Sequence, residues 1–217
     1  MSTISYPVNL DLTDRPVLVV GGGPVAARKV SGLLRAGARV TVVAPDAVPE
    51  ISEDPDVQWF PREYRRGEVA SYRLAITATD QPAVNTQVRV DGDAAGVFVN
   101  SADDPANCSF TLPAVARHGD LQVAISTGGR SPALSRWLRR RLETELGAGY
   151  DHLLDLLEEV RAELRTERGT SEHPGWDAAL DQDLLELART GRIEEARRRL
   201  RSHVELRPTP AEREVAS

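Results

Sequence analysis

The apolar positions in the first hundred residues form short runs that alternate with segments of helical periodicity. Residues 17–20 are apolar throughout, which is typical of a parallel strand buried on both faces. Val30, Leu33 and Leu34 then recur at helical spacing within residues 25–36, and residues 39–43 form a second apolar strand. Strand, helix and strand follow one another within about 30 residues, which indicates a βαβ unit.

The same alternation continues to about residue 100. Further strands are predicted at residues 57–60, 73–79 and 97–100, with a helix over residues 82–95. Strands that alternate with helices favour an α/β fold with a doubly wound, Rossmann-type parallel sheet. We therefore expect residues 1–112 to form a Rossmann-type domain.

The pattern changes after this point. Residues 109–117 and 121–127, separated by "HGD", predict an antiparallel hairpin. "GGRSP" interrupts the chain at residues 128–132, and helices are expected from Ala133 onward, over residues 177–189 and over 193–204. An apolar stripe at helical spacing is predicted to face a core and consists of Tyr150, Leu153, Leu154, Leu157, Val160 and Leu164. The domains expected here are a hairpin region, 113–147, an α-helical C-terminal domain, 148–207, and a disordered tail, 208–217.

Composition restricts the classes of protein that remain. The 217 residues hold no apolar run of the roughly 18 residues that a membrane span needs, and no signal peptide is evident. The net charge of −6 argues against a nucleic-acid partner. A single cysteine, Cys108, suits a reducing cytoplasm. The four histidines lack the spacing of a metal site, so no resident metal is expected.

The segment "GGGPVAARK" carries a nucleotide-binding pattern. Gly21, Gly23 and Ala26 fit G-x-G-x-x-G/A between a strand and a helix. Gly21 permits a tight turn, Gly23 leaves room for a pyrophosphate, and Ala26 allows close helix packing. The N–H groups at the start of the helix then face the phosphates. The alternative is a tight turn without a ligand.

The end of the second strand bears on the choice of cofactor. An acidic residue there binds the ribose in NAD-dependent proteins, and this strand ends with Pro45 and Asp46. No Arg follows that would receive the 2′-phosphate of NADP, so NAD is favoured. Asp46 also fits a solvated loop position or a helix N-cap.

Four segments in this order resemble one known family: "GGGPVAARKV", "AITATD", "NSADDPANCSFTLPA" and "VAISTGGRSPALSRWLR". They are similar to the precorrin-2 dehydrogenase and sirohydrochlorin ferrochelatase family, the N-terminal part of siroheme synthase. The resemblance implies NAD-dependent oxidation of precorrin-2 to sirohydrochlorin. In some members Fe²⁺ insertion follows, which makes Fe²⁺ a further candidate substrate. It also implies a homodimer, with residues 113–147 as the dimerisation region.

The resemblance extends to single residues. The family's catalytic aspartate lies in an N-x-x-D segment, which here begins at Asn100 and ends at Asp103; Asp104 follows immediately. Asn100 is a candidate substrate contact. The cofactor site maps to Gly23, Pro24, Val25, Pro45, Asp46, Thr79 and Asp80. Without the resemblance, the position of Asp103 in "DDP" favours a turn-forming residue stabilised by local hydrogen bonds.

The segment "STGGRSP" is a candidate anion site, because two glycines precede a Ser-Pro helix start and the substrate carries many carboxylates. Its candidate contacts are Ser126, Thr127 and Arg130, and an ordinary strand turn is the alternative. The arginine-rich segment that follows fits a solvated or interface face. The competing functions are a non-catalytic NAD-binding regulatory module and a reductase of another substrate. His152 and His173 are candidates to assist a chelatase reaction, with simple exposure as the alternative.

Overall fold

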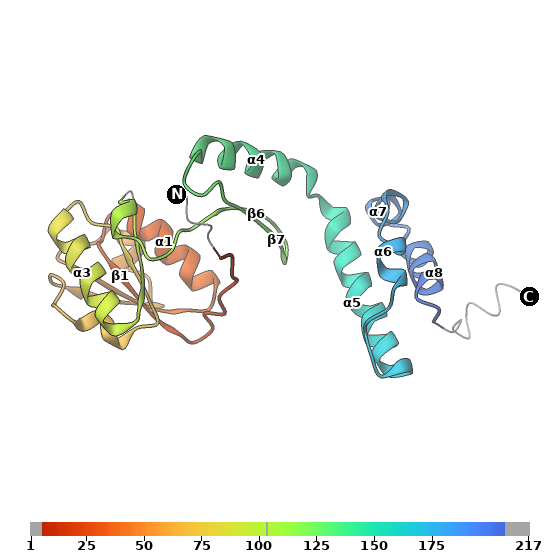
Figure 1. Ribbon diagram of the computed structural model, residues 1–217, viewed down its shortest axis with the longest axis horizontal. Helices are drawn as coiled ribbons and strands as arrows, with labels where there is room; N and C mark the ends of the chain where they lie inside the picture. The colour runs from red at the N-terminus through yellow and green to blue at the C-terminus, as the bar shows by residue number, and fades with distance from the viewer. Residues whose placement is uncertain (1–5, 103, 207–217) are drawn as a thin grey trace, which may run out of the picture. The chain divides into compact units, whose positions relative to one another are not determined.

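The chain divides into two compact units. The computed structural model describes residues 6–102 and 104–206. Ser5–Leu112 form one unit and the chain from Pro113 forms the other (Figure 1). No helix among the described residues combines the length and apolarity that a membrane crossing requires.

The first unit is built on a parallel sheet of five strands in the order β3-β2-β1-β4-β5. This confirms the predicted doubly wound, Rossmann-type sheet. The strands are β1 (Pro16–Val20), β2 (Arg39–Ala44), β3 (Val57–Pro61), β4 (Leu74–Thr77) and β5 (Phe98–Ser101). The chain runs outward from β1 to β3 and then returns to place β4 on the other side of β1. Ligands of open α/β sheets bind at such a reversal, beyond the carboxyl ends of the strands.

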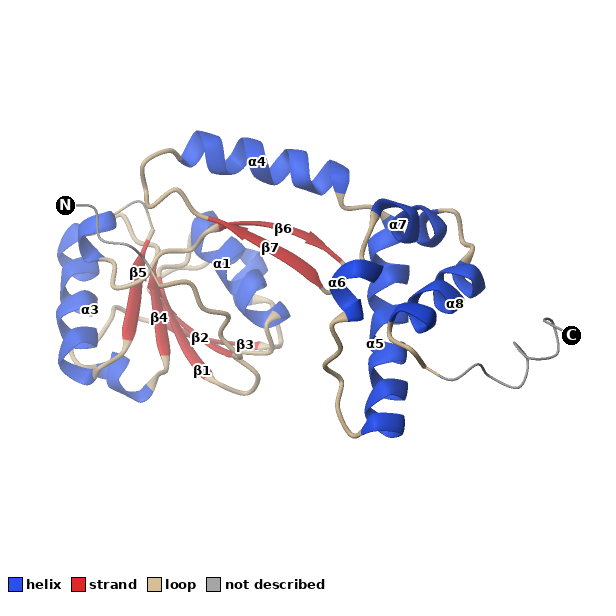
Figure 2. Ribbon diagram, turned by 45° about the vertical axis from the view of Figure 1, so that its right-hand side comes forward, coloured by secondary structure: helices blue, strands red, loops and turns tan. Residues whose placement is uncertain are grey.

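Alternating side chains of the sheet build two apolar layers. Val17 and Val19 of β1 pack against α1 (Pro24–Arg35), whereas Leu18 and Val20 face the layer that holds α3 (Pro82–Ala95). The two helices accordingly lie on opposite sides of the sheet (Figure 2). Three short helices were not predicted, because a single turn leaves no periodicity: α2 (Pro49–Ser52), η1 (Glu68–Ser71) and η2 (Pro105–Asn107).

The second unit contains a hairpin and five helices among its described residues. The strands β6 (Ala114–His118) and β7 (Leu121–Ile125) pair antiparallel, as predicted. The helices are α4 (Pro132–Glu145), α5 (Ala148–Arg168), α6 (Gly175–Ala179), α7 (Gln182–Arg189) and α8 (Ile193–His203). The main core of this unit consists of side chains of α5, α7 and α8 and their neighbours, among them Leu156, Leu164, Leu184 and Leu200.

The first hairpin strand begins later than predicted. Residues 109–110 do not pair with β7 but turn back to β5. The Ser109 N–H donates to the Val99 carbonyl at 2.7 Å, and the Ser109 hydroxyl accepts the Val99 N–H at 2.7 Å. The predicted strand over residues 109–117 is therefore shorter, because its first residues bond to β5 and the paired strand begins only at Ala114.

Two predictions in the helical part are corrected. Leu154 of the predicted stripe is 39% exposed, whereas Leu156 is 2% exposed and takes the core position. The helix predicted over residues 177–189 is two helices. Asp181 separates them, because its carboxylate accepts the Leu184 N–H at 2.9 Å and begins α7. A capping aspartate thus outweighs continuous periodicity.

Candidate functional site

The glycine turn joins three strands at their carboxyl ends. Gly21 follows β1 with a φ of +121°, a conformation that side chains rarely adopt. Its N–H donates to the Val43 carbonyl at 3.0 Å, and a Cβ at this position would collide with the Ala78 carbonyl after β4. Gly21 therefore allows β1, β2 and β4 to meet in one place.

Gly22 is a second glycine that the turn requires. The sequence did not predict this, because Gly22 occupies a variable position of the motif. Its carbonyl accepts the Val48 N–H at 2.9 Å. A Cβ on Gly22 would collide with the Asp46 carbonyl oxygen. The only signal in the sequence was the run of three glycines. Gly22 brings the segment after β2 against the turn.

Gly23 opens onto free space. A Cβ built there meets no protein atom within 4 Å, and its φ of −82° is accessible to every residue. Gly23 is the N-cap of α1, no side chain caps the helix, and Pro24 at its first position brings no N–H of its own. The N–H groups at this helix start are thus available to an anion. Ala26, fully buried, packs the helix on the sheet.

A cleft of about 660 Å³ lies beyond the carboxyl ends of the strands. We call it the glycine-turn cleft. Eight of the nine sequence-predicted cofactor residues line it, and the ninth, Ala26, lies buried behind it in the contact between α1 and the sheet. It is lined by Val20–Val25, Val43–Asp46, Glu63, Tyr64, Ala78–Gln81, Val84 and Ala102. Among these lining residues the charged side chains are the carboxylates of Asp46, Glu63 and Asp80. The cleft has the position and the backbone donors that a dinucleotide requires.

The segment after β4 is held by its own hydrogen bonds. The Thr79 hydroxyl accepts the Gln81 N–H at 2.8 Å, and the Thr79 carbonyl accepts the side-chain N–H of buried Asn85 at 3.2 Å. Asp80 and Asp46 are both exposed, one after β4 and one after β2. The rim of the cleft is therefore partly fixed and carries negative charge.

The loop after β5 contains the two adjacent aspartates. Asp103, the predicted catalytic residue, lies outside the described residues. The Asp104 carboxylate accepts the Asn107 side-chain N–H at 2.7 Å. The Cys108 thiol accepts the Ser101 N–H at 3.2 Å and lies 3.4 Å from the Asp104 carbonyl. Cys108 therefore links the end of β5 to the loop at Asp104.

Asn100 is 7% exposed, and its side chain is engaged within the chain. Its amide N–H donates to the Phe110 carbonyl at 3.0 Å, with the Cys108 sulfur at 3.6 Å. It does not belong to the lining of the glycine-turn cleft. This geometry gives Asn100 a role in shaping the loop, and its predicted contact with substrate stays a prediction.

The three predicted anion-site residues lie together in the loop between β7 and α4, in the second unit. The Ser126 hydroxyl accepts the Gly128 N–H at 3.2 Å. The Thr127 hydroxyl accepts the Ser131 N–H at 3.1 Å and lies 3.4 Å from the Ser135 hydroxyl. Arg130 is exposed. Gly128 and Gly129 both have positive φ. They form the turn that brings the Thr127 hydroxyl near the start of α4.

The histidines serve local contacts. One ring nitrogen of His152 lies 3.1 Å from the Ala188 carbonyl, and one of His173 accepts the Gly175 N–H at 3.0 Å. His118 pairs with Asp151 of α5 at 2.8 Å. Within the described residues no group of three or more His, Cys, Asp or Glu side chains is arranged to hold a metal ion.

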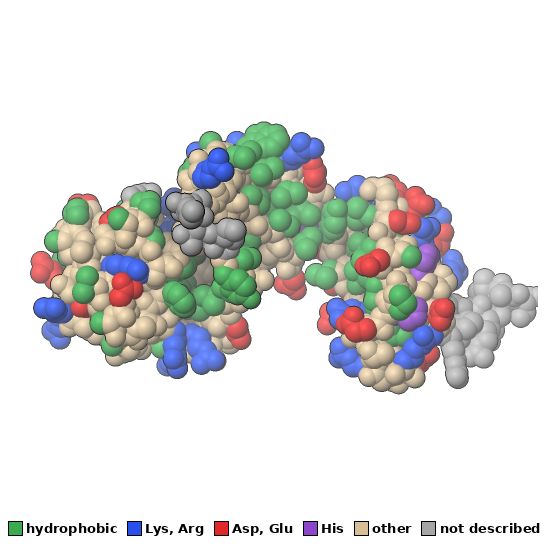
Figure 3. Space-filling model, in the orientation of Figure 1, with side chains coloured by type: hydrophobic (Ala, Val, Ile, Leu, Met, Phe, Trp, Pro, Cys, Tyr) green, Lys and Arg blue, Asp and Glu red, His purple; other side chains and the backbone are tan. Residues whose placement is uncertain are grey.

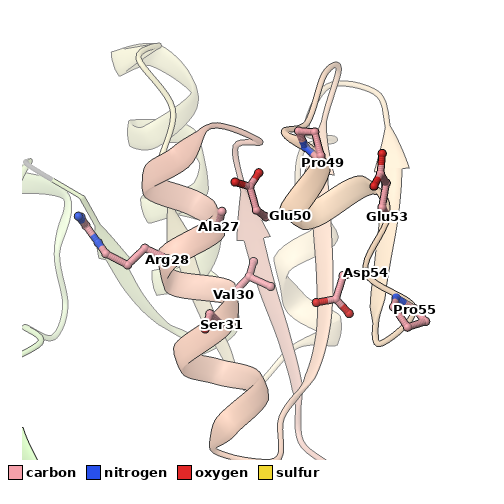
Figure 4. A pocket seen from close by; sticks show the side chains of 9 residues that line it. All are labelled: Ala27, Arg28, Val30, Ser31, Pro49, Glu50, Glu53, Asp54 and Pro55. Atoms are coloured by element: carbon pink, nitrogen blue, oxygen red, sulfur yellow. The ribbon is translucent and has the colours of Figure 1, made fainter.

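A second groove lies on the first unit between α1 and α2 (Figure 4). Glu50, Glu53 and Asp54 are among the residues that line it, and the Arg28 side chain extends away from α2. It lacks the glycine turn, and the carboxylates that line it disfavour an anion, so it offers no comparable phosphate site.

The fold and the glycine-turn cleft together define an NAD(P)-binding protein of the Rossmann type. Residues 8–114 match the family described as putative NAD(P)-binding, and residues 118–145 match the family described as sirohaem biosynthesis protein central.

Similar proteins extend this result over most of the chain. A siroheme synthase of Thioalkalivibrio sulfidiphilus (strain HL-EbGR7) is 38% identical over 205 residues, which cover 92% of this chain and 42% of that protein. A siroheme synthase of Methylococcus capsulatus is 39% identical over 199 residues, covering 88% and 42% respectively. The chain thus spans less than half the length of these relatives. The solved structure "SirC, precorrin-2 dehydrogenase" is 28% identical with a TM-score of 0.70, and the match covers 91% of this chain and 100% of that one. The chain belongs to the family of siroheme synthases and precorrin-2 dehydrogenases.

Proposed function

We propose that this protein oxidises precorrin-2 to sirohydrochlorin with NAD⁺. The observation that carries the proposal is the glycine-turn cleft, in a chain that aligns with the full length of a structure titled precorrin-2 dehydrogenase. The open space at Gly23 and the uncapped start of α1 suit a pyrophosphate. A non-catalytic regulatory module is less consistent with the family to which the chain belongs.

The charge of the cleft supports NAD⁺ over NADP⁺. The 2′-phosphate of NADP needs a cation near the end of β2. Asp46 occupies that place, and the described lining of the cleft contains no Arg, Lys or His side chain. A phosphate at this end would face carboxylates instead.

The chain's own residues would then orient the cofactor and accept a proton. NAD⁺ supplies the hydride acceptor when bound. Oxidation also releases a proton from the macrocycle, and a carboxylate beyond a strand end is a suitable acceptor. Asp103 is the candidate, since the neighbouring Asp104 carboxylate is engaged with Asn107. Removing a positioned general base typically costs about 10²–10⁴-fold in rate.

Iron insertion into sirohydrochlorin is a further part of the proposal, with Fe²⁺ as substrate. Pyrrole N–H protons must leave as the metal enters, and Asp103 would accept them in this step too. The direct test of both activities is absorbance. Folded protein mixed with precorrin-2 and NAD⁺ should yield the sirohydrochlorin spectrum, and added Fe²⁺ should convert it to that of siroheme. Absence of the first change overturns the dehydrogenase proposal.

We also propose a homodimer formed through the hairpin and α4. A two-stranded hairpin is marginal in water unless another element covers it. Here Leu134 and Trp137 of α4 are 46% and 48% exposed, and Figure 3 shows hydrophobic side chains gathered over α4 and the hairpin. Sedimentation should give a dimer, and Trp137→Glu should shift it toward monomer; an unchanged monomer in both would contradict the proposal.

A further inference from the structure

A buried carboxylate on α3 holds a loop at the mouth of the glycine-turn cleft. Asp91 is 8% exposed and uses both carboxylate oxygens. One accepts the Tyr64 O–H at 2.9 Å and the Gly67 N–H at 2.7 Å, and the other accepts the Gln87 side-chain N–H at 2.7 Å. Residues 62–67, which we call the anchored loop, are therefore tied to a helix more than twenty positions away in sequence.

A second anchor fixes the other side of the same loop. The Arg62 guanidinium makes two hydrogen bonds to the Glu68 carboxylate, at 3.0 and 2.6 Å. Glu68 also accepts the Arg65 N–H at 2.6 Å. Such paired, charge-assisted bonds fix geometry as well as contributing energy.

The anchored loop directs negative rather than positive charge to the cleft. It contains three arginines, yet Glu63 and Tyr64 are the loop residues that line the cleft. Arg62 is bound to Glu68, and Arg66 lies 3.9 Å from Asp91. The loop thus presents a carboxylate and an aromatic ring to the cleft. An arginine in the same place would favour a dinucleotide with a 2′-phosphate.

The register of the sheet brings the segments that carry Glu63 and Asp46 to the same edge of the sheet. Ala44 at the end of β2 pairs with Pro61 at the end of β3. Asp46 and Glu63 each follow this pair by two residues, in the segments that leave two neighbouring strands about 4.8 Å apart. Both line the glycine-turn cleft at the end where the adenosine ribose of a dinucleotide would lie.

We propose that Glu63, held in place by the Tyr64–Asp91 contact, is a specificity-determining residue that makes the cleft discriminate against a 2′-phosphorylated dinucleotide. This inference rests on the proposed use of NAD⁺. Asp46 would bind the ribose hydroxyls, and Glu63 would repel a phosphate attached to them. Tyr64 and Asp91 act through Glu63 and are positioning residues.

The experiment measures dissociation constants for NAD⁺ and NADP⁺ by calorimetry at low and high salt. Glu63→Gln should lower the dissociation constant for NADP⁺ by about threefold to tenfold at low salt and leave that for NAD⁺ nearly unchanged. The gain should shrink at high salt, since exposed charges are screened. Glu53→Gln is the matched control: it removes an exposed carboxylate of the same unit that lines only the other groove, and it should change neither constant.

Tyr64→Phe tests the anchor without removing charge or the ring. It should weaken NAD⁺ binding modestly. It should also reduce the preference for NAD⁺ over NADP⁺ toward that of Glu63→Gln, while the circular dichroism spectrum stays unchanged. Equal effects of Glu63→Gln on both dinucleotides, or no effect on either, overturn the inference while NAD⁺ binding by the wild type leaves the proposed cofactor intact. A wild type that binds NADP⁺ as tightly as NAD⁺ overturns the proposed cofactor and this inference together.

Discussion

The Asn107 side-chain amide donates a hydrogen bond to the Asp104 carboxylate at 2.7 Å, which commits that carboxylate to its own turn. We therefore expect Asp103→Ala to lose about 10²–10⁴-fold in the rate of precorrin-2 oxidation while NAD⁺ still binds. Asp104→Ala should retain most of the rate and lose some stability of the loop. Steady-state rates of the two variants decide between them, and a reversed order would assign the proton acceptor to Asp104.

Gly23 should be needed for the cofactor but not for the fold. Because no protein atom lies within 4 Å of a Cβ there, Gly23→Val should fold normally and lose NAD⁺ binding. Gly21→Val is the matched comparison, and it should fail to fold stably, because its φ of +121° and the Ala78 carbonyl exclude a side chain. Calorimetry and circular dichroism separate the two outcomes. Unchanged NAD⁺ affinity in Gly23→Val would place the pyrophosphate elsewhere.

The Asp91 carboxylate should make the first unit sensitive to acid. Burial acts to raise the pKa of Asp91, but hydrogen bonds from Gly67, Tyr64 and Gln87 outweigh it and lower the pKa below its usual value. A lowered pKa means that the stabilisation is present above the unfolded value of about 3.9 and is lost as the pH falls through the folded pKa. Asp91→Asn should therefore cost about 1–3 kcal/mol of unfolding free energy at pH 7 and progressively less below about pH 4.

Urea unfolding followed by Trp59 fluorescence measures this difference, in a background with Trp137 and Trp176 replaced by Phe. Trp59 lies on β3, whereas the other two tryptophans lie in the second unit. A cost that stays constant down to pH 3 would mean that charge at Asp91 is not what stabilises the loop.

In the helical part, Leu156 and Leu154 should differ sharply despite lying two residues apart. Leu156→Ala removes a side chain that is 2% exposed and should cost about 2–5 kcal/mol. Leu154→Ala removes one that is 39% exposed and should cost less than about 1 kcal/mol. Thermal unfolding monitored by helical circular dichroism tests both, and similar costs would mean that α5 faces its core differently.

The parts of the fold set by local sequence were predictable. The β1, glycine-turn and α1 segment combines a short apolar run, a glycine pattern and helical spacing within one window. The helix start at Asp181 was not predictable, because the apolar periodicity continues through it and only the side-chain cap marks it. The burial of Leu156 was not predictable either, because contacts with α7 and α8 determine which side of α5 faces the core.

The candidate site was predictable where a motif carries it and not where partners are distant. Gly22 is required by the backbone of Asp46, 24 positions later. Tyr64 is bonded to Asp91 across 27 positions. No local pattern marks either relationship, since each arises only when β2, β3 and α3 are assembled around the sheet.

The return of Ser109 to Val99 has a consequence for the edge of the sheet. β5 is an outer strand of the sheet, and an unpaired strand edge is a template on which another chain can add. Ser109 hydrogen-bonds to both the N–H and the carbonyl of Val99, so these two groups cannot pair with a strand of another chain. The segment that leads the chain out of its first unit thereby makes this part of the β5 edge unavailable to another strand.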